Sequence, residues 1–589
     1  MKQRVYRWLV ERGGLITLVV LALYIWIAPP HIVNGDNAEF STLGTTGGAA
    51  HPPGYPAYLM WLRLWSWLPV QSPAHAAAIA TGILTSIQTL VLHAACRAWG
   101  ARPTAAAIVV GVYAAGPIVL RVQSEAEVFA PHSLICALVL WLSASAGPLR
   151  GMWRVAALGL VAGLGISNQL TCVLLAPVGL LGAVRGVRED ARPVVAASAG
   201  VLGLVLGLST YLYLLITPDT WGSWGKLRSF HDLWWHFLRM DYGGPGAFAP
   251  DGVDVPLIDN LVAWLRTIGR SYVWAPSILA VVALGYLCVR PIKESRAAWL
   301  LLTASWLVCG PILSSRFNLA LDDAGTYVVQ RFHLMSALVL AIPLAVALDR
   351  IASRIENERA RSHARLLQVV LPIVITVGVS VRSLPYVARF HTAAMERGVE
   401  NLLTTLPENA IVFGAPDIYH FGLNYLQEAL RLRRDVLVIT TPQLKLDFHR
   451  ERVQARAGIV IDPDPTRTMN VPLTEKLLAI GRPVFVDQYQ FTIVKAFPTY
   501  PYGLVYRVLP RGSQVPSVVE AYDINRELFD RYKFGYTPPG MEDEEATRFH
   551  NAYANVWRIL SESLARIGET EKARDALTRA YVLAPENDR

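Results

Sequence analysis

Two acidic residues and a histidine stand close together early in the chain, in the stretch 34–58. Asp36 and Glu39 follow an apolar run within a few residues, and carboxylates at such a place can accept or deliver protons in a reaction. His51 stands beside a bend, because the prolines and the glycine of residues 52–56 forbid a continuous helix. Aromatic residues follow, as is typical of a membrane interface. We interpret this stretch as a shaped site at a membrane surface rather than as a solvated acidic loop.

A second acidic pair lies in the sequence RVQSEAEVF, where Glu125 and Glu127 separate two apolar segments. Ionisable groups at membrane depth are costly and usually functional, although these two would also be explained by a position in interfacial water. Asp232 and His236 have the spacing of one helical turn, but no third ligand is near them. A metal site normally needs three or four protein ligands, so we assign no metal there.

The composition is that of a membrane protein. Hydrophobic residues make up 53% of the 589 residues and charged residues only 17%, and the mean hydropathy is +0.34. A soluble protein of this length would have to expose large apolar patches. The five cysteines lie in or beside apolar segments, which argues against a disulfide framework or a cysteine metal site.

About eleven apolar segments are long enough, or nearly so, to cross a bilayer with roughly 20 residues each. The predicted spans cover residues 14–30, 76–96, 103–121, 128–146, 153–168, 170–185, 194–216, 272–289, 297–313, 329–348 and 366–384. The fifth and sixth spans are short and are joined by Ser167, Asn168 and Gln169. Residues 153–185 therefore form either two spans or one broken helix.

The basic residues of the connecting loops predict the orientation, because Lys and Arg near span ends resist translocation. With a cytoplasmic N-terminus, the cytoplasmic loops hold most of these residues. The opposite side then receives residues 31–75, 121–127, 217–270, 314–328 and everything after 385. We expect a multi-pass protein of the cell inner membrane whose C-terminal domain is periplasmic. The net charge of +9 reflects this topology and does not indicate binding of nucleic acid.

The composition changes after Pro385 to that of a soluble module. The runs AIVFGAPD, DVLVITT, RPVFVDQ and LVYRVLP predict strands around helical stretches. Near the end of the chain, Trp557, Gly568 and Ala580 have the spacing of one tetratricopeptide (TPR) repeat, which must pack on a neighbour because one repeat cannot bury its own face. We divide the chain into a transmembrane domain (1–385), an α/β domain (386–515) and a TPR-like helical segment (516–589).

Several motifs together resemble a known family. In order along the chain they are NGDNAEF with AHPPGYP, then SEAEVF, GLGISNQLT, QRFHLM and IVFGAPDIYHFGLNYLQEALRLRRDVLVI. Over residues 10–510 the chain resembles a large bacterial family of membrane proteins of unknown function, whose eukaryotic relatives are protein O-mannosyltransferases of the GT-C fold. DNAEF keeps both acids of the family motif, whereas the family's histidine after Ser-Asn is Gln169 here. The resemblance implies a GT-C-like, α-helical polytopic membrane protein with an extracytoplasmic α/β domain.

The resemblance also implies an inverting glycosyltransferase that moves one sugar, mannose or another hexose, from a polyprenyl-phosphate carrier to an extracytoplasmic hydroxyl such as Ser or Thr of a protein. Such a transfer needs a carboxylate to take the acceptor proton and cations to hold the departing phosphate. Asp36 is our candidate base, and Glu39 an acid that orients or binds the acceptor. The expected substrate-binding residues are His51, Glu125, Glu127, Asn168, Gln169, Gln330, Arg331 and His333.

Arg331 is our candidate phosphate holder, near the outer start of the tenth span, with His333 as a weaker helper. A structural alternative is an arginine that reaches to the lipid headgroups. The expected partners are membrane lipids, the polyprenyl-phosphate sugar, a protein or glycan acceptor, and a protein bound by the TPR-like segment. No cofactor is assigned, and a divalent metal stays open. Two other classes of function compete, namely a transporter or flippase for lipid-linked sugars and a membrane-tethered envelope assembly factor.

Overall fold

The computed structural model describes residues 7–244, 253–355, 364–414, 417–461, 470–539 and 544–584, and these form two compact units. The first unit consists of Met1–Pro30, Ala49–Thr217 and Leu227–Ala388, and the second of His31–Gly48, Pro218–Lys226 and Arg389–Arg589. The second unit therefore includes two short segments of residues 1–385, the range predicted as one transmembrane domain.

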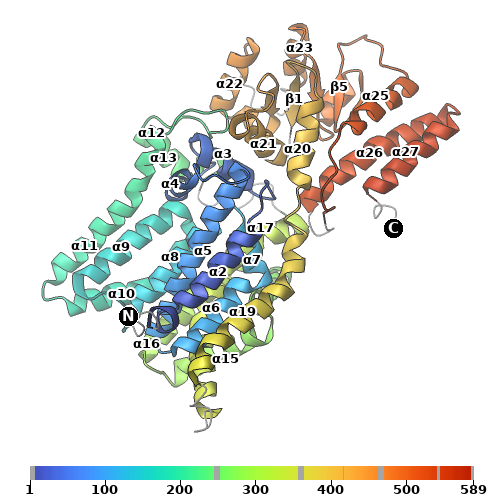
Figure 1. Ribbon diagram of the computed structural model, residues 1–589. Coiled ribbons are helices and arrows are strands. Elements are labelled where there is room, and N and C mark those ends of the chain that lie inside the picture. Colours follow the sequence, from blue (N-terminus) through green and yellow to red (C-terminus); the bar gives the residue numbers. More distant parts are fainter. Residues whose placement is uncertain are drawn as a thin grey trace. The chain divides into compact units, whose positions relative to one another are not determined.

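The first unit is helical (Figure 1). Several of its helices begin with a proline. Proline suits this position because the first N–H of a helix has no partner within the helix and because the fixed φ of proline is close to the helical value. The longer helices are α2 (Gly14–Ile27), α4 (Pro56–Trp65), α5 (Pro73–Ala98), α6 (Pro103–Ala115), α7 (Pro117–Ser124), α8 (Phe129–Ser143), α9 (Gly151–Asn168), α10 (Ala176–Glu189), α11 (Pro193–Leu208), α13 (Phe230–Phe237), α14 (Leu257–Ser271), α15 (Ala275–Val289), α16 (Arg296–Leu307), α17 (Asp323–Ile355) and α19 (Ala364–Ala388).

The described part of the chain has five helical segments that are long and apolar enough to cross a membrane. They are Pro73–Ala98, Leu170–Glu189, Pro193–Ile216, Gly325–Arg354 and Gln368–Ala388. Two further pairs pass the same test but are bent, α6 with α7 by 66° and α14 with α15 by 106°, and three shorter apolar helices add to these. The protein is thus a polytopic helical membrane protein, while the count of eleven spans stays a prediction.

Two predicted spans differ from the observed helices. Residues 103–121 were expected to form one straight span, but the chain bends between α6 and α7 at Gly116. Residues 272–289 were expected to begin a span directly, but α15 begins at Ala275 after the sharp bend that follows α14. Proline after glycine, as in Gly116-Pro117, interrupts the helical hydrogen bonds and explains the first bend.

Residues 153–185 form two helical segments rather than one broken helix. A Cβ atom on Gly186 would lie 2.9 Å from the carbonyl oxygen of Gly151, and one on Gly182 would lie 2.9 Å from the Leu158 side chain. The two ends of this region are therefore neighbours, which requires the chain to reverse. The reversal follows Asn168, where α9 ends, and the short 3-10 turn Leu170–Leu175 leads into α10.

The second unit contains a mixed five-stranded sheet with the order β2-β1-β3-β5-β4. Its strands are β1 (Ile411–Gly414), β2 (Leu437–Thr440), β3 (Val484–Val486), β4 (Thr499–Tyr502) and β5 (Val505–Val508). β1 pairs in parallel with β2 and β3, and β5 pairs antiparallel with β3 and β4. β1, β2, β3 and β5 fall on the four expected runs, and β4 was not expected.

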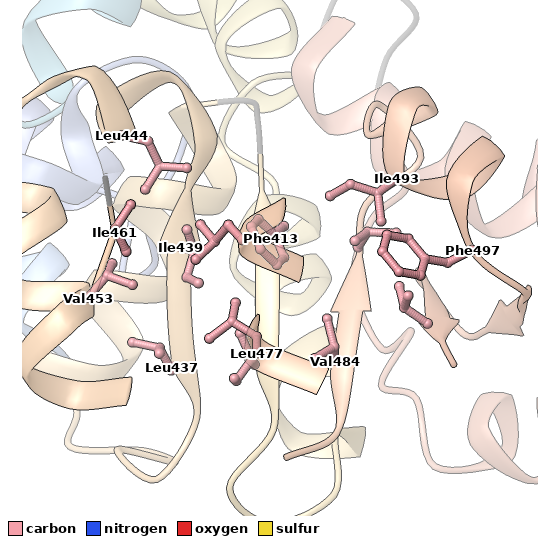
Figure 2. Close-up of a cluster of buried hydrophobic side chains, with 14 residues drawn as sticks. Phe413, Leu437, Ile439, Leu444, Val453, Ile461, Leu477, Val484, Ile493 and Phe497 are labelled. Carbon is pink, nitrogen blue, oxygen red and sulfur yellow. The ribbon is translucent and has the colours of Figure 1, made fainter. Parts of the chain in front are cut away.

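Apolar side chains form the core of this sheet (Figure 2). Phe413, Ile439 and Val484 come from three neighbouring strands and are fully buried. Leu477 of α23 (Asn470–Ala479) and Ile493 of α24 (Phe491–Ala496) cover them. The near-continuous apolar runs of β1 and β2 match strands that are buried on both faces.

The C-terminal helices α26 (Glu544–Arg566) and α27 (Thr570–Leu583) form a hairpin. Gly568 adopts a φ of 86° at the turn, which favours glycine after a helix. Trp557 is fully buried, with its ring 4.9 Å from Phe529 of α25 (Val518–Asp530). The Asn401 amide of α20 (Ala394–Thr405) donates a 2.9 Å hydrogen bond to the Tyr553 hydroxyl. The helical hairpin thus packs its apolar face within the same unit, and its assignment as a TPR-like repeat stays a prediction.

Candidate active site

The acidic pair Glu125 and Glu127 lies in the short connection between α7 and α8, and both side chains are fully buried. The helix ends at Ser124, and Glu125 takes an extended conformation that turns the chain inward. The alternative in which these acids sit in interfacial water is therefore wrong. A buried carboxylate needs a positive or hydrogen-bonding partner, because an isolated charge is strongly disfavoured in an apolar surrounding.

Arg331 supplies one such partner. Its Nη1 donates to Glu127 Oε1 at 3.0 Å, and the Arg331 side chain is 10% exposed. Its guanidinium carbon lies 4.8 Å from the ring centre of Tyr327 and 5.4 Å from that of Phe129. The planar cation is thus held between aromatic rings and a carboxylate. An arginine that reaches to lipid headgroups would be exposed, so this alternative is also wrong.

Tyr327 connects the two acids. Its hydroxyl donates to Glu125 Oε2 at 2.9 Å, and a second guanidinium, that of Arg121, stacks on its ring at 4.1 Å. Arg121 Nε also lies 3.9 Å from Glu125 Oε1. We call Arg121, Glu125, Glu127, Tyr327 and Arg331 the Tyr327 cluster. The positive charges of two arginines in this cluster compensate the negative charges of two glutamates. A buried ionic group needs such compensation.

Arg121 and Tyr327 were not among the expected site residues. Each lies four residues before an expected one, Arg121 before Glu125 and Tyr327 before Arg331. Residues four apart share a helix face, so this spacing is a signal that could have found Tyr327, which lies on α17 with Arg331. Glu125 lies just after α7, so the same argument does not apply to Arg121.

Asn168, the last residue of α9, contacts the acidic loop. The Asn168 amide donates to the carbonyl oxygen of Val128 at 3.1 Å, directly beside Glu127. Gln169 ends α9, and its backbone N–H donates to the carbonyl of Gly165 at 2.7 Å. Asn168 therefore supports the Glu127 loop through a backbone contact, whereas Gln169 has a helix-ending role.

Gln330 and His333 lie on α17 on either side of Arg331, and both are buried. His333 Nδ1 is 3.2 Å from the hydroxyl of Thr267 on α14, and its ring packs against Phe317. These contacts direct His333 into the protein interior. The structure does not place it beside the Arg331 guanidinium.

His51 lies at the predicted bend. Its Nε2 is 3.2 Å from the Tyr55 hydroxyl, and Gly54 N–H donates to the His51 carbonyl at 2.9 Å. Gly54 has a φ of 99°, and a Cβ there would lie 2.8 Å from Leu214. Glycine is therefore required for this turn.

The turn packs against α13, which carries the exposed residues Phe230, Trp234 and Trp235. His236 of that helix contacts the carbonyl of Ala50 at 2.9 Å, and burial lowers the pKa of His236 to about 4, so the ring is neutral and can donate this bond. Asp232 caps the helix through Ser229. Asp232 and His236 thus have separate structural roles.

Asp36 and Glu39 belong to the second unit, whereas the other expected site residues belong to the first. Asp36 precedes α3 (Asn37–Thr46) and is half-buried, and Glu39 is 2% exposed. α3 packs on α21 (Asp417–Asn424) and on the π-helical turn Tyr425–Ala429 of the same unit.

The backbone before Asp36 is held by side chains. Ile32 N–H donates to Glu396 Oε2 at 3.1 Å, and Val33 N–H donates to Asn37 Oδ1 at 3.2 Å. Burial raises the pKa of Glu396. The chain thus presents Asp36 from a fixed turn at a helix start, where the helix dipole favours a negative charge.

Comparison with known proteins identifies relatives over much of the chain. The family described as the N-terminal domain of the protein O-mannosyl-transferase TMEM260 matches residues 36–189. The mouse protein O-mannosyl-transferase TMEM260 is 24% identical over 450 residues, which are 73% of this chain and 62% of the relative. The corresponding Dictyostelium discoideum protein is 23% identical over 288 residues, 44% of this chain and 34% of that one. The chain thus spans less than two thirds of either relative.

A solved structure supports the fold assignment. ArnT from Cupriavidus metallidurans, in a crystal structure bound to undecaprenyl phosphate, matches with a TM-score of 0.56 and 15% identity, over 85% of this chain and 99% of the other. At this identity the likeness concerns the fold, which is a GT-C-like polytopic helical membrane fold. In sequence, the chain is similar to the TMEM260 protein O-mannosyl-transferases over the ranges given above.

Proposed function

We propose that this protein is a membrane glycosyltransferase that moves one hexose, mannose in the first instance, from a polyprenyl-phosphate carrier to an extracytoplasmic hydroxyl. The observation that carries this proposal is the relationship to proteins named protein O-mannosyl-transferases. The fold likeness to a protein bound to undecaprenyl phosphate supports the carrier. A serine or threonine hydroxyl of a protein is the acceptor that fits the relatives' names.

Asp36 takes the acceptor proton in this proposal. As the hydroxyl oxygen attacks the anomeric carbon, its proton passes to the Asp36 carboxylate, and the bond between that carbon and the phosphate oxygen breaks. The electron pair leaves with the lipid phosphate, so the phosphate gains negative charge. Attack from the face opposite the phosphate inverts the anomeric configuration. Glu39 binds or orients the acceptor from the first turn of α3.

Arg331 holds the departing phosphate in this proposal, and Arg121 assists it. A guanidinium offers paired N–H donors that match two phosphate oxygens, and a buried, water-poor setting strengthens that interaction. The Tyr327 cluster fixes the orientation of both guanidiniums through ring stacking and through Glu125 and Glu127. This preorganisation supports a role in binding an anion whose charge increases during the reaction.

The competing functions make different predictions. A flippase for lipid-linked sugars moves the donor without breaking the glycosyl bond, so no sugar reaches an acceptor. An assembly factor would act through the α/β and TPR-like modules after residue 385, and substitutions at Asp36 or Arg331 would leave its function intact.

Comparing envelope glycoproteins and glycolipids from cells with and without the gene tests the proposal. We expect the deletion to remove a defined hexose-bearing species, and restoration of the gene to return it. Unchanged glycoproteins together with accumulation of the carrier on one side of the membrane would support the flippase instead.

A further inference from the structure

A cavity of about 440 Å³ lies among helices α8, α9, α10 and α11 of the first unit. Aliphatic side chains, glycines and the Cys172 side chain line it. Three of the lining residues, Val173, Leu180 and Val201, are half or more exposed, so the cavity opens at the surface of the unit. It contains none of the residues to which we assign roles in transfer. An apolar cavity of this size excludes water and accepts hydrocarbon.

Close packing of α9 with α11 shapes this cavity. A Cβ atom on Gly159 would lie 2.0 Å from the Gly200 carbonyl oxygen, and one on Gly207 would lie 2.5 Å from that of Leu160. Small residues let the two backbones touch, as in many membrane helix pairs. The cavity lies between α10 and the packed pair of α9 and α11. Along α9 the lining runs from Val155 to Ile166, which corresponds to about 16 Å at the helical rise, a length suited to a lipid chain.

One end of the cavity meets a basic loop. α10 and α11 both belong to candidate spans, so the connection between them, residues 190–192, lies at a membrane surface. Val187 lines the cavity at this end and is followed by Arg188, and Arg192 precedes α11. Both arginines are exposed, and neither forms an ion pair with another residue that the structure describes.

The acids at this end are already engaged. Glu189 pairs with the fully buried Arg154 at 3.2 Å, and Asp190 accepts bonds from the backbone N–H groups of Met152 at 2.7 Å and of Arg192 at 2.9 Å. Arg185 pairs with Glu294 at 2.6 Å. Asp190 also interacts electrostatically with Arg192, while the exposed guanidinium groups of Arg188 and Arg192 can both reach an anion at the membrane surface. Basic residues at the end of a pocket between membrane helices are typical of sites for anionic lipid headgroups.

We propose that this cavity binds one anionic glycerophospholipid, with an acyl chain between α9, α10 and α11 and the headgroup phosphate at Arg188 and Arg192. This site is separate from the proposed donor site, because Arg331 lies at the start of α17 and its predicted side of the membrane is opposite to that of residues 190–192. The proposal does not depend on the transferase function.

Native mass spectrometry of the purified full chain tests this proposal. The protein is mixed with equal amounts of phosphatidylglycerol and phosphatidylethanolamine, and the retained lipids are counted. We expect wild type to retain phosphatidylglycerol preferentially, and the double variant Arg188→Gln/Arg192→Gln to lose that preference. The matched control Arg290→Gln/Arg296→Gln changes two other exposed arginines of the same unit and should keep it.

A second variant tests the cavity itself. Ala183→Phe places a ring in the space and keeps both arginines, so we expect it to retain less of both lipids. Equal phosphatidylglycerol preference in Arg188→Gln/Arg192→Gln and wild type would overturn the proposal, whether or not Ala183→Phe folds. Displacement of phosphatidylglycerol by undecaprenyl phosphate, sensitive to the same two arginines, would also overturn it and would assign the cavity to the carrier lipid.

Discussion

Replacing Arg331 by lysine is the perturbation that separates a phosphate-binding arginine from a structural one. Lysine keeps a positive charge near Glu127, so the buried carboxylate stays compensated. It loses the planar fork that can grip two phosphate oxygens, and it loses the flat surface that lies 4.8 Å from the Tyr327 ring centre. The change thus removes the geometry of the cation more than its charge.

The size of the effect follows from these contacts. A hydrogen bond to a charged group contributes about 1.5–3 kcal/mol, which corresponds to roughly 10- to 150-fold in rate or affinity. Because the phosphate gains charge as the glycosyl bond breaks, we expect Arg331→Lys to lower kcat as well as to raise the donor KM. Arg331→Ala should be worse, since it removes the cation that pairs with the buried Glu127 and costs about 3–5 kcal/mol of stability.

Steady-state kinetics with a polyprenyl-phosphate mannose donor measure both parameters, and thermal unfolding of each variant shows whether the protein is folded. The control is Arg316→Lys, which changes an exposed arginine of the first unit and should match wild type. If Arg331→Lys has wild-type kcat and donor KM, Arg331 has a structural role and the phosphate site lies elsewhere.

Three other predictions follow from the structure. Tyr327→Phe removes the hydroxyl that donates to Glu125 at 2.9 Å, so the free energy of unfolding should fall by about 1–3 kcal/mol in denaturation experiments, and an unchanged value would remove Tyr327 from the cluster. Trp557→Ala should destabilise the α26–α27 hairpin by about 3–5 kcal/mol, seen as faster proteolysis within it, because the ring is fully buried. Reporter fusions after Arg188 and after Pro407 should lie on opposite sides of the membrane, cytoplasmic and periplasmic, and finding both on one side would mean that a span is miscounted.

Local sequence patterns predicted the helices and strands whose positions depend on the hydropathy of consecutive residues. Apolar runs located helices such as α5, α10 and α11, and strands β1 and β2, because burial and chain direction set their composition. β4 was not predicted, since its sequence TYPY contains a proline and its side chains are only partly buried. The bend at Gly116 was not predicted, because mean hydropathy is taken over a window of many residues and does not register a helix break at a single Gly-Pro pair.

The candidate site was only partly predictable for a different reason. The sequence left open whether Glu127 has a function at membrane depth or lies in interfacial water, because nothing in RVQSEAEVF reveals that Arg331, about two hundred residues later, lies beside it. Arg121 was not among the expected site residues for the same reason. Contacts between residues far apart in sequence decide burial here, and a single sequence does not record them. The family motifs pointed to Glu125, Glu127 and Arg331 but not to the aromatic ring that joins them.

The most direct test of the proposed transfer is an assay with Asp36→Asn. Purified wild-type protein in lipid vesicles is given polyprenyl-phosphate mannose with a radioactive label, and membranes from cells lacking the gene supply the acceptor. We expect labelled acceptor with wild type and a loss of about 10²- to 10⁴-fold with Asp36→Asn, because asparagine cannot take the proton. Its stability should match wild type, since asparagine is as good as aspartate before a helix. Asp254→Asn, an exposed acid of the first unit, should transfer normally. Wild-type transfer by Asp36→Asn would contradict the account.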